Sequence, residues 1–135
     1  MRLRRKRCVL RALRKSRELS LVQDYTDRIC KGDILLVTTI RNEKIRLPYF
    51  LQYYRGLGVN HFLFVDNDSN DGARAYLDGI EDVSVWFTRG SYKSATFGVD
   101  WVNYLLRKYA HGHWSLIVDP DEFFIATTMK PSDTA

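Results

Sequence analysis

Residues 62–72 read FLFVDNDSNDG, an apolar run that passes directly into a loop of acidic and amide side chains. Short runs of β-branched and aromatic residues are typical of buried strands. A second stretch of the same design, residues 114–124, reads WSLIVDPDEFF. Each stretch therefore predicts a buried strand that ends in a loop carrying carboxylates.

The two acidic loops could form one binding site if their strands belong to one parallel sheet. Ligands of open parallel sheets bind at the carboxyl ends of the strands. We expect Asp66 and Asp119 to end neighbouring strands at a common edge, where up to six carboxylates would gather. Carboxylates so close repel one another unless a cation or basic side chains compensate. The pattern is typical of a divalent cation that holds an anionic ligand.

The rest of the chain predicts further strands and helices in alternation. Residues 34–40 (ILLVTTI) and 83–87 (VSVWF) resemble buried strands, and apolar residues recur at helical spacing over about 47–57 and 97–109. A short helix is expected between Asp71 and Gly79, and a fifth strand from Phe123. This alternation predicts an α/β fold with a mostly parallel sheet flanked by helices. Because another βα unit would be expected after residue 128, the sheet is expected to be incomplete at its C-terminal end.

Composition indicates one globular domain with a basic leader. The 135 residues are 45% hydrophobic, which suits a single domain, here assigned to residues 33–128, with a polar tail over 129–135. Residues 1–32 are interpreted as a basic helical leader, with a helix over 2–30. No uncharged run approaches the length of a membrane span, and no secretory signal is present. The two cysteines form no scaffold pattern, so a reduced, cytoplasmic protein is expected.

The leader leaves four alternatives open. Residues 1–20 hold nine of the 21 Lys and Arg residues but only one acidic residue, Glu18. They could form a solvated helix packed on a partner, a peripheral contact with anionic lipid at the inner membrane surface, an organelle transit segment, or a nucleic-acid contact. No aromatic residue interleaves these arginines to stack on bases, so nucleic acid is not expected as a partner.

Other kinds of site fit the sequence less well. A calcium loop of the EF-hand type starting at Asp66 would place its glycine one position late and Leu77 where a bidentate Glu is needed. The three histidines do not cluster with the cysteines, which disfavours zinc. No dinucleotide or Walker-type glycine loop is present, and no nucleophile elbow. Among the cations that could reach the predicted edge, Lys93 belongs to a loop suited to phosphate.

Taken together, the motifs resemble a known family. A strand followed by Arg41-Asn42-Glu43, then VDNDSNDG ending at Gly72, then Asp119-Pro-Asp121-Glu-Phe, is similar to the nucleotide-sugar-binding half of family 2-like glycosyltransferases with the GT-A fold. The resemblance covers residues 33–126. It implies a GT-A or Rossmann-like sheet, a nucleoside-diphosphate sugar as donor, and Mn²⁺ or Mg²⁺ as cofactor.

The resemblance also implies roles for individual residues. The exit of the first strand should border the nucleobase, Asp66 and Asn67 should approach the base or ribose, and Asp119 and Asp121 should ligate the metal on the diphosphate. Many relatives carry Asp where this chain has Asn67. The expected nucleotide-sugar site comprises Thr39, Arg41, Asn42, Glu43, Asp66, Asn67, Asp68, Lys93 and Asp119.

The implied reaction is transfer of a sugar from the nucleotide to an acceptor hydroxyl on a saccharide or a lipid-linked molecule. Such a transfer needs a general base within reach of that hydroxyl. The base of the family is expected beyond residue 135, so no catalytic residue is assigned here and enzymatic activity stays open. The alternative is a truncated, non-catalytic remnant or interaction module that keeps the fold.

Overall fold

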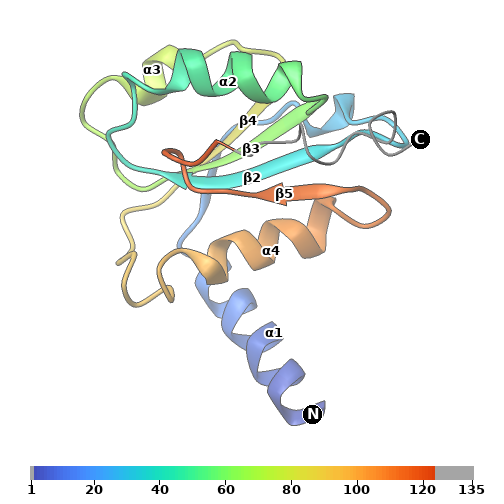
Figure 1. Ribbon diagram of the computed structural model, residues 1–135. Helices are drawn as coiled ribbons and strands as arrows, with labels where there is room; N and C mark the ends of the chain where they lie inside the picture. The colour runs from blue at the N-terminus through green and yellow to red at the C-terminus, as the bar shows by residue number, and fades with distance from the viewer. Residues whose placement is uncertain (1, 124–135) are drawn as a thin grey trace.

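The computed structural model describes residues 2–123 of the chain, with side chains from residue 9 onward. Its centre is a five-stranded sheet with the order β1-β4-β3-β2-β5 (Figure 1). The strands are β1 (Ser20–Gln23), β2 (Leu35–Ile40), β3 (His61–Asp66), β4 (Val83–Phe87) and β5 (Ser115–Ile117). Strands β2 to β5 pair in parallel, whereas β1 is antiparallel to β4. The expected α/β fold with a mostly parallel sheet is confirmed.

Helices cover both faces of this sheet (Figure 1). On one face lie α2 (Leu47–Gly56) and α3 (Ala73–Leu77), which connect β2 to β3 and β3 to β4. On the other face lies α4 (Val99–Tyr109), and α1 (Arg2–Ser16) packs outside α4. A one-turn 3₁₀ helix, η1 (Thr26–Arg28), follows β1. The sheet is therefore the middle layer of the domain.

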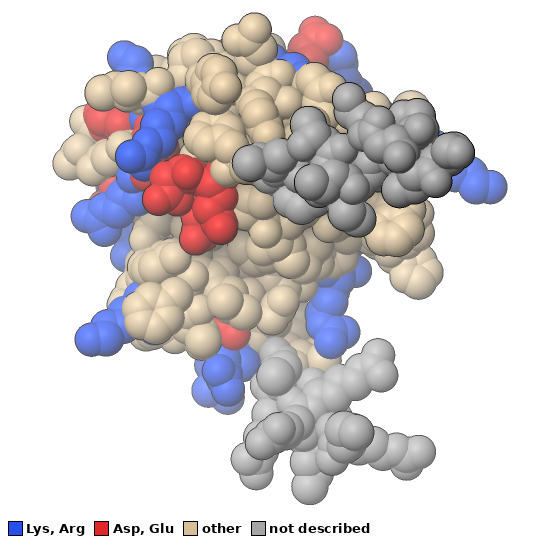
Figure 2. Space-filling view, in the orientation of Figure 1, with Lys and Arg blue, Asp and Glu red and all other residues tan. Residues whose placement is uncertain are grey.

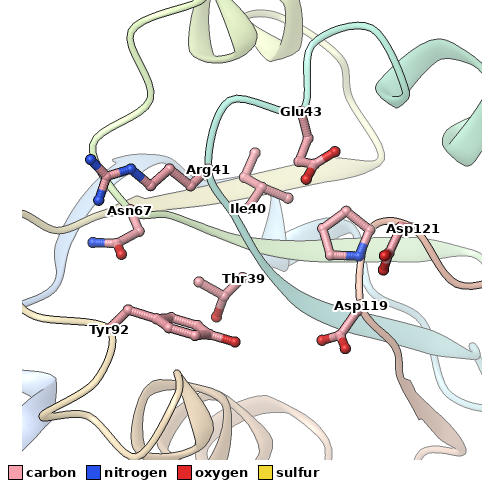
Figure 3. A pocket seen from close by; sticks show the side chains of 9 residues that line it. Thr39, Ile40, Arg41, Glu43, Asn67, Tyr92, Asp119 and Asp121 are labelled. Carbon is pink, nitrogen blue, oxygen red and sulfur yellow. The ribbon is translucent and has the colours of Figure 1, made fainter.

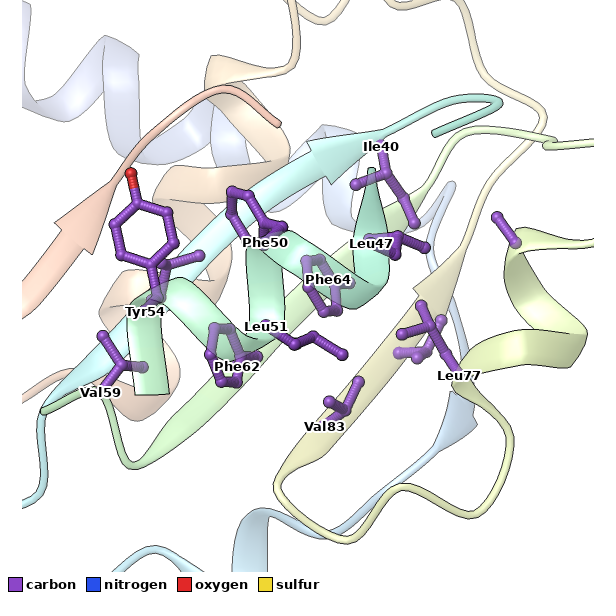
Figure 4. Packing of buried hydrophobic residues seen from close by; sticks show 13 residues of the cluster. Ile40, Leu47, Phe50, Leu51, Tyr54, Val59, Phe62, Phe64, Leu77 and Val83 are labelled. Atoms are coloured by element: carbon purple, nitrogen blue, oxygen red, sulfur yellow. The ribbon is translucent and has the colours of Figure 1, made fainter. Parts of the chain in front are cut away.

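Two apolar cores stabilise the layers, one on each face of the sheet. The core under α2 includes Phe50, Tyr54, Phe62 and Phe64, whose rings contact one another (Figure 4). The core under α4 is built around the buried Trp101 and draws on alternate residues of the same strands. Because β2 and β3 are buried on both faces, their sequences are almost continuously apolar.

The expected helix over residues 2–30 is wrong beyond Ser16. The chain leaves the helix there, and residues 20–23 form β1, the edge strand that pairs with β4. Part of the segment interpreted as a leader thus belongs to the sheet. Three of the four residues of β1 are exposed, so its sequence carries little of the apolar signal that marks a buried strand. The fifth strand expected from residue 123 lies almost entirely outside the described residues.

Gln23 fixes β1 in place through its side-chain amide. Its Nε2 lies within hydrogen-bond distance of the carbonyl oxygens of Leu77, Ile80 and Val83, at 3.1, 3.3 and 2.9 Å. Its Oε1 accepts the N–H of Gly79 at 2.9 Å. One side chain therefore binds the whole turn between α3 and β4.

Replacing Gln23 with Ala should remove one hydrogen bond from each of these backbone groups, although the carbonyl oxygens of Leu77 and Ile80 each keep one N–H donor. We expect the free energy of unfolding to fall by about 1–3 kcal/mol, the cost of orphaned and partly buried polar groups. Urea denaturation followed by circular dichroism measures this loss. Gln52→Ala, on the exposed side of α2, is the matched control and should be nearly neutral. Equal stability of the two variants would contradict the role of Gln23.

His61 is a buried titratable group in β3, with 2% of its surface exposed. Its Nε2 lies 2.9 Å from Ser84 Oγ, which already accepts the N–H of Tyr25 at 2.9 Å. The Ser84 hydroxyl can therefore donate its proton to the neutral ring. Burial is the main cause that lowers the pKa of His61, and nearby carboxylates, Asp82 first, oppose it only in part.

A lowered pKa in the folded state means that the unfolded chain binds a proton first as the pH falls. Stability should decrease as the pH drops below about 6.5, the ordinary histidine value, and keep decreasing until the folded pKa is reached. We expect His61→Gln to lose less stability than wild type between neutral and mildly acidic pH, measured by urea denaturation. His111→Gln, at an exposed position, should follow the wild-type profile. An unchanged profile for His61→Gln would remove His61 as the cause.

Candidate functional site

The strand order creates a switch point between β2 and β5. From β2 the chain moves through β3 to β4 on one side, and then returns by α4 to place β5 on the other side of β2. Ligands of open α/β sheets bind in the crevice that forms at the carboxyl ends of the strands on either side of such a point. A cavity of about 400 Å³ lies there.

The cavity draws its walls from the ends of three strands and one loop (Figure 3). Two of the contributing strands, β3 and β5, are not neighbours as expected but flank β2 on opposite sides. Six residues proposed from the sequence are brought together here: Thr39, Arg41, Glu43, Asn67, Asp119 and Asp121. The remaining lining residues are Ile40, Tyr92 and Pro120.

Four proposed site residues do not line this cavity. Asp66 is fully buried, and its Oδ1 accepts the N–H of Ser69 at 3.1 Å. The Oδ1 of Asn42 accepts the N–H of Asn70 at 2.7 Å, which fastens the loop after β2 to the loop after β3. The other two, Asp68 and Lys93, are exposed nearby.

The acidic loop after β3 uses its carboxylates to hold its own backbone. Asp71 accepts the N–H of Ala73, at the start of α3, with Oδ1 and the N–H of Lys44 with Oδ2, both at 3.0 Å. Both oxygens of Asp71 are thus used by the backbone, whereas Asp66 Oδ2 is buried without a hydrogen-bond partner among the described residues and Asp68 is exposed. Of the six carboxylates expected at one edge, Asp119 and Asp121 are the two that line the cavity.

The carboxylates after β5 are less well compensated. Asp119 remains accessible, yet partial burial, followed by the negative charges of Glu122 and Asp121, raises the pKa of its carboxyl. The Asp119 N–H donates to Glu122 Oε1 at 2.8 Å, which keeps the second carboxylate close. Figure 2 shows acidic side chains gathered on this face beside basic ones. A cation near Asp119 would relieve this repulsion.

Basic and amide groups occupy the opposite wall (Figure 3). Arg41 is exposed at the cavity and takes part in no ion pair among residues 9–123. Asn67 is 98% buried, and its Nδ2 donates to the carbonyl oxygens of Gly90 at 3.0 Å and Thr88 at 3.3 Å. These two acceptors fix the orientation of the amide, since the flipped form would set oxygen against oxygen. Asn67 Oδ1 is therefore the atom turned to the cavity.

Tyr92 is a cavity residue that sequence reasoning missed. Burial raises the pKa of its hydroxyl, as does the negative charge of Asp119, toward which the hydroxyl points in Figure 3. An adjoining hollow of about 240 Å³ shares Tyr92, Thr39 and Asp119 with the cavity and is otherwise mostly apolar, with Phe97 on its wall. The sequence signal that could have identified Tyr92 is its place as the one aromatic residue within the polar stretch 89–94.

Gly98 lets this loop approach β2 closely. Its φ is +82°, and an added Cβ would lie 2.9 Å from Tyr92 Cε1 and 3.0 Å from Thr39 Oγ1. The two preceding residues, Thr96 and Phe97, also have positive φ angles, of 55° and 57°. Thr39 Oγ1 is buried beneath this loop and has no hydrogen-bond partner among the described residues.

The donor set suits a shared metal better than a complete protein cage. Among residues 9–123, no group of three or more His, Cys, Asp or Glu side chains is arranged to hold a metal ion. Asp119 and Asp121 could supply one or two carboxylate ligands. Mg²⁺ commonly takes one or two carboxylates from the protein and completes its shell with phosphate oxygens and water. The residues present fit that arrangement.

Comparison with known proteins adds no family assignment. No protein-family model matches this chain, and no curated protein matches it significantly.

The fixed orientation of Asn67 gives a direct test of the cavity wall. In Asn67→Asp the carbonyl oxygens of Thr88 and Gly90 would face a carboxylate oxygen instead of an N–H donor. We expect a loss of about 1–3 kcal/mol in the free energy of unfolding, measured by urea denaturation at neutral pH.

Asn60→Asp is the matched control for this change. The Oδ1 of Asn60 accepts the N–H of Ile34 at 2.8 Å, so a carboxylate preserves its hydrogen bond. Its stability should stay close to that of wild type. If Asn67→Asp is equally stable, the amide orientation described here is wrong.

Proposed function

We propose that the cavity binds a nucleoside-diphosphate sugar together with Mn²⁺ or Mg²⁺. In this proposal the domain is the donor-binding half of a family 2-like glycosyltransferase with the GT-A fold. The observation that carries the proposal is the position of the cavity at the switch point, with the Asp119 and Asp121 carboxylates on one wall and the Arg41 guanidinium on another. A metal-bound diphosphate needs both kinds of charge, because carboxylates hold its cation and a guanidinium pairs with phosphate oxygens.

Each wall would then bind a different part of the donor. Asp119 and Asp121 would hold the cation on the diphosphate, and Arg41 would contact its free oxygens. Thr39 and Asn67, at the ends of β2 and β3, would face the nucleoside. When bound, the cation acts as a Lewis acid that stabilises the negative charge on the departing diphosphate. The transferred sugar would pass to an acceptor hydroxyl of a saccharide or a lipid-linked molecule.

The amide of Asn67 favours particular bases. With Nδ2 donated to two backbone carbonyls, its Oδ1 is left as a hydrogen-bond acceptor at the cavity. At this position the amide oxygen therefore acts as a hydrogen-bond acceptor, as a carboxylate oxygen would. Uracil and guanine can donate a ring N–H to it, whereas cytosine has no ring N–H on its pairing edge and can donate only through its exocyclic amine. We expect UDP or GDP to bind more tightly than CDP.

Nucleotide binding in the presence and absence of metal tests this function. Isothermal titration calorimetry should show binding of UDP or GDP with Mn²⁺ and its loss with EDTA. Asp121→Asn removes one carboxylate charge from the cation and should weaken Mn²⁺-dependent binding by about tenfold or more. Asp27→Asn, at an exposed site in η1, is the matched control and should bind as wild type does.

Two results would count against the proposal. One is nucleotide binding that EDTA does not change, and the other is the absence of binding for UDP, GDP and CDP alike. Incubating the chain with nucleotide sugars and detecting released nucleotide separates an active transferase from the alternative of a non-catalytic module. Metal-dependent binding without any transfer or hydrolysis would favour that module.

A further inference from the structure

We propose that α1 lies on an anionic lipid surface and presents this domain to it. The exposure of its side chains identifies the face involved. Ala12, on the side of α4, is 1% exposed, whereas Leu10 and Leu13 are 61% and 50% exposed. Arg14, one turn after Leu10, and Arg17, directly after the end of the helix, are exposed as well. The outward face of α1 therefore combines leucines with arginines.

Such a face suits the boundary between water and lipid. Helices that lie in this boundary bury Leu side chains among the acyl chains and place Lys and Arg at the headgroups. The long arginine side chains can extend to the phosphates while the leucines enter the apolar layer. None of the helices within residues 2–123 has the length and apolarity needed to cross a bilayer. Binding would therefore occur at the surface.

The charge of the segment is complementary to anionic lipid. Residues 1–20 carry nine Lys and Arg residues, and no acidic residue precedes Glu18. Each Lys or Arg near an anionic surface contributes about fivefold to the binding constant. Two of these cations are turned to the body: Arg11 donates to Thr96 Oγ1 at 3.3 Å and Lys15 to Ser94 Oγ at 3.1 Å. Arg14 and Arg17 are left to face outward.

Other occupants of this face fit less well. Two leucines offer far less apolar area than the roughly 800 Å² per partner of a stable protein interface. Single-stranded nucleic acid is bound by aromatic stacking as well as by charge, and α1 contains no aromatic residue. A lipid surface needs only a few inserted side chains once several cations are in place.

Sedimentation with vesicles tests the proposal on the full chain. We expect binding to vesicles of mixed phosphatidylcholine and phosphatidylglycerol, weak or no binding to pure phosphatidylcholine, and weaker binding at high salt. Leu10→Ser/Leu13→Ser and Arg14→Glu/Arg17→Glu should each reduce the affinity by about tenfold or more. Circular dichroism and melting temperature verify that each variant is folded.

Matched variants elsewhere on the surface serve as controls. Ile45→Ser/Leu57→Ser removes two exposed apolar residues, and Lys31→Glu/Arg107→Glu reverses two exposed charges, all outside α1. Both should bind vesicles as wild type does. Equal binding to neutral and anionic vesicles, no binding to either, or full binding by the leucine variant would overturn the proposal. So would tighter binding to an RNA oligonucleotide that the leucine variant retains. These outcomes do not depend on whether the cavity binds nucleotides.

Discussion

The parallel pairing of β2 with both β3 and β5 is the constraint on which the site depends. In this arrangement the carboxyl ends of all three strands meet at one edge, so residues 39, 67 and 119 come together although they are far apart in sequence. The pairing is enforced by burial, because β2 packs Leu36 and Ile40 into one core and Leu35 and Val37 into the other. A slip of one residue would exchange these faces and place the cavity residues elsewhere.

The loops after β3 and β5 both contain three acidic residues, but the structure uses their carboxylates differently. After β3 the N–H of Ser69 donates to Asp66 Oδ1, and two further N–H groups donate to the two oxygens of Asp71. Asp66 Oδ2 is buried without a hydrogen-bond partner among the described residues. After β5 the carboxylates of Asp119, Asp121 and Glu122 lie within one tight turn, and partial burial, followed by the charges of Glu122 and Asp121, raises the pKa of Asp119. Of the carboxylates in the two loops, those of Asp119 and Asp121 line the cavity, where a metal-bound diphosphate would need their charge.

These differences mark how far the sequence could predict the structure. Buried strands such as β3 and β4 could be predicted, because short, nearly continuous apolar runs are typical of strands in the core of a sheet. Strand β1 could not be predicted, because its residues SLVQ are mostly exposed and directly follow a basic helix. It is held by pairing with β4 and by Gln23, whose side chain reaches a turn far away in the sequence. The burial of Asp66 and the contribution of Tyr92 were equally hidden, because both depend on how loops close over the sheet.

Loop 91–98 connects the basic helix with the cavity. On one side it accepts hydrogen bonds from Arg11 and Lys15 of α1. On the other side it supplies Tyr92 to the cavity and packs Gly98 against Thr39, in a backbone conformation that leaves no room for a Cβ. A surface bound by α1 and a ligand bound beside Tyr92 would therefore contact segments joined through one loop. Both the position of the helix and the cavity wall thus involve side chains of residues 91–98.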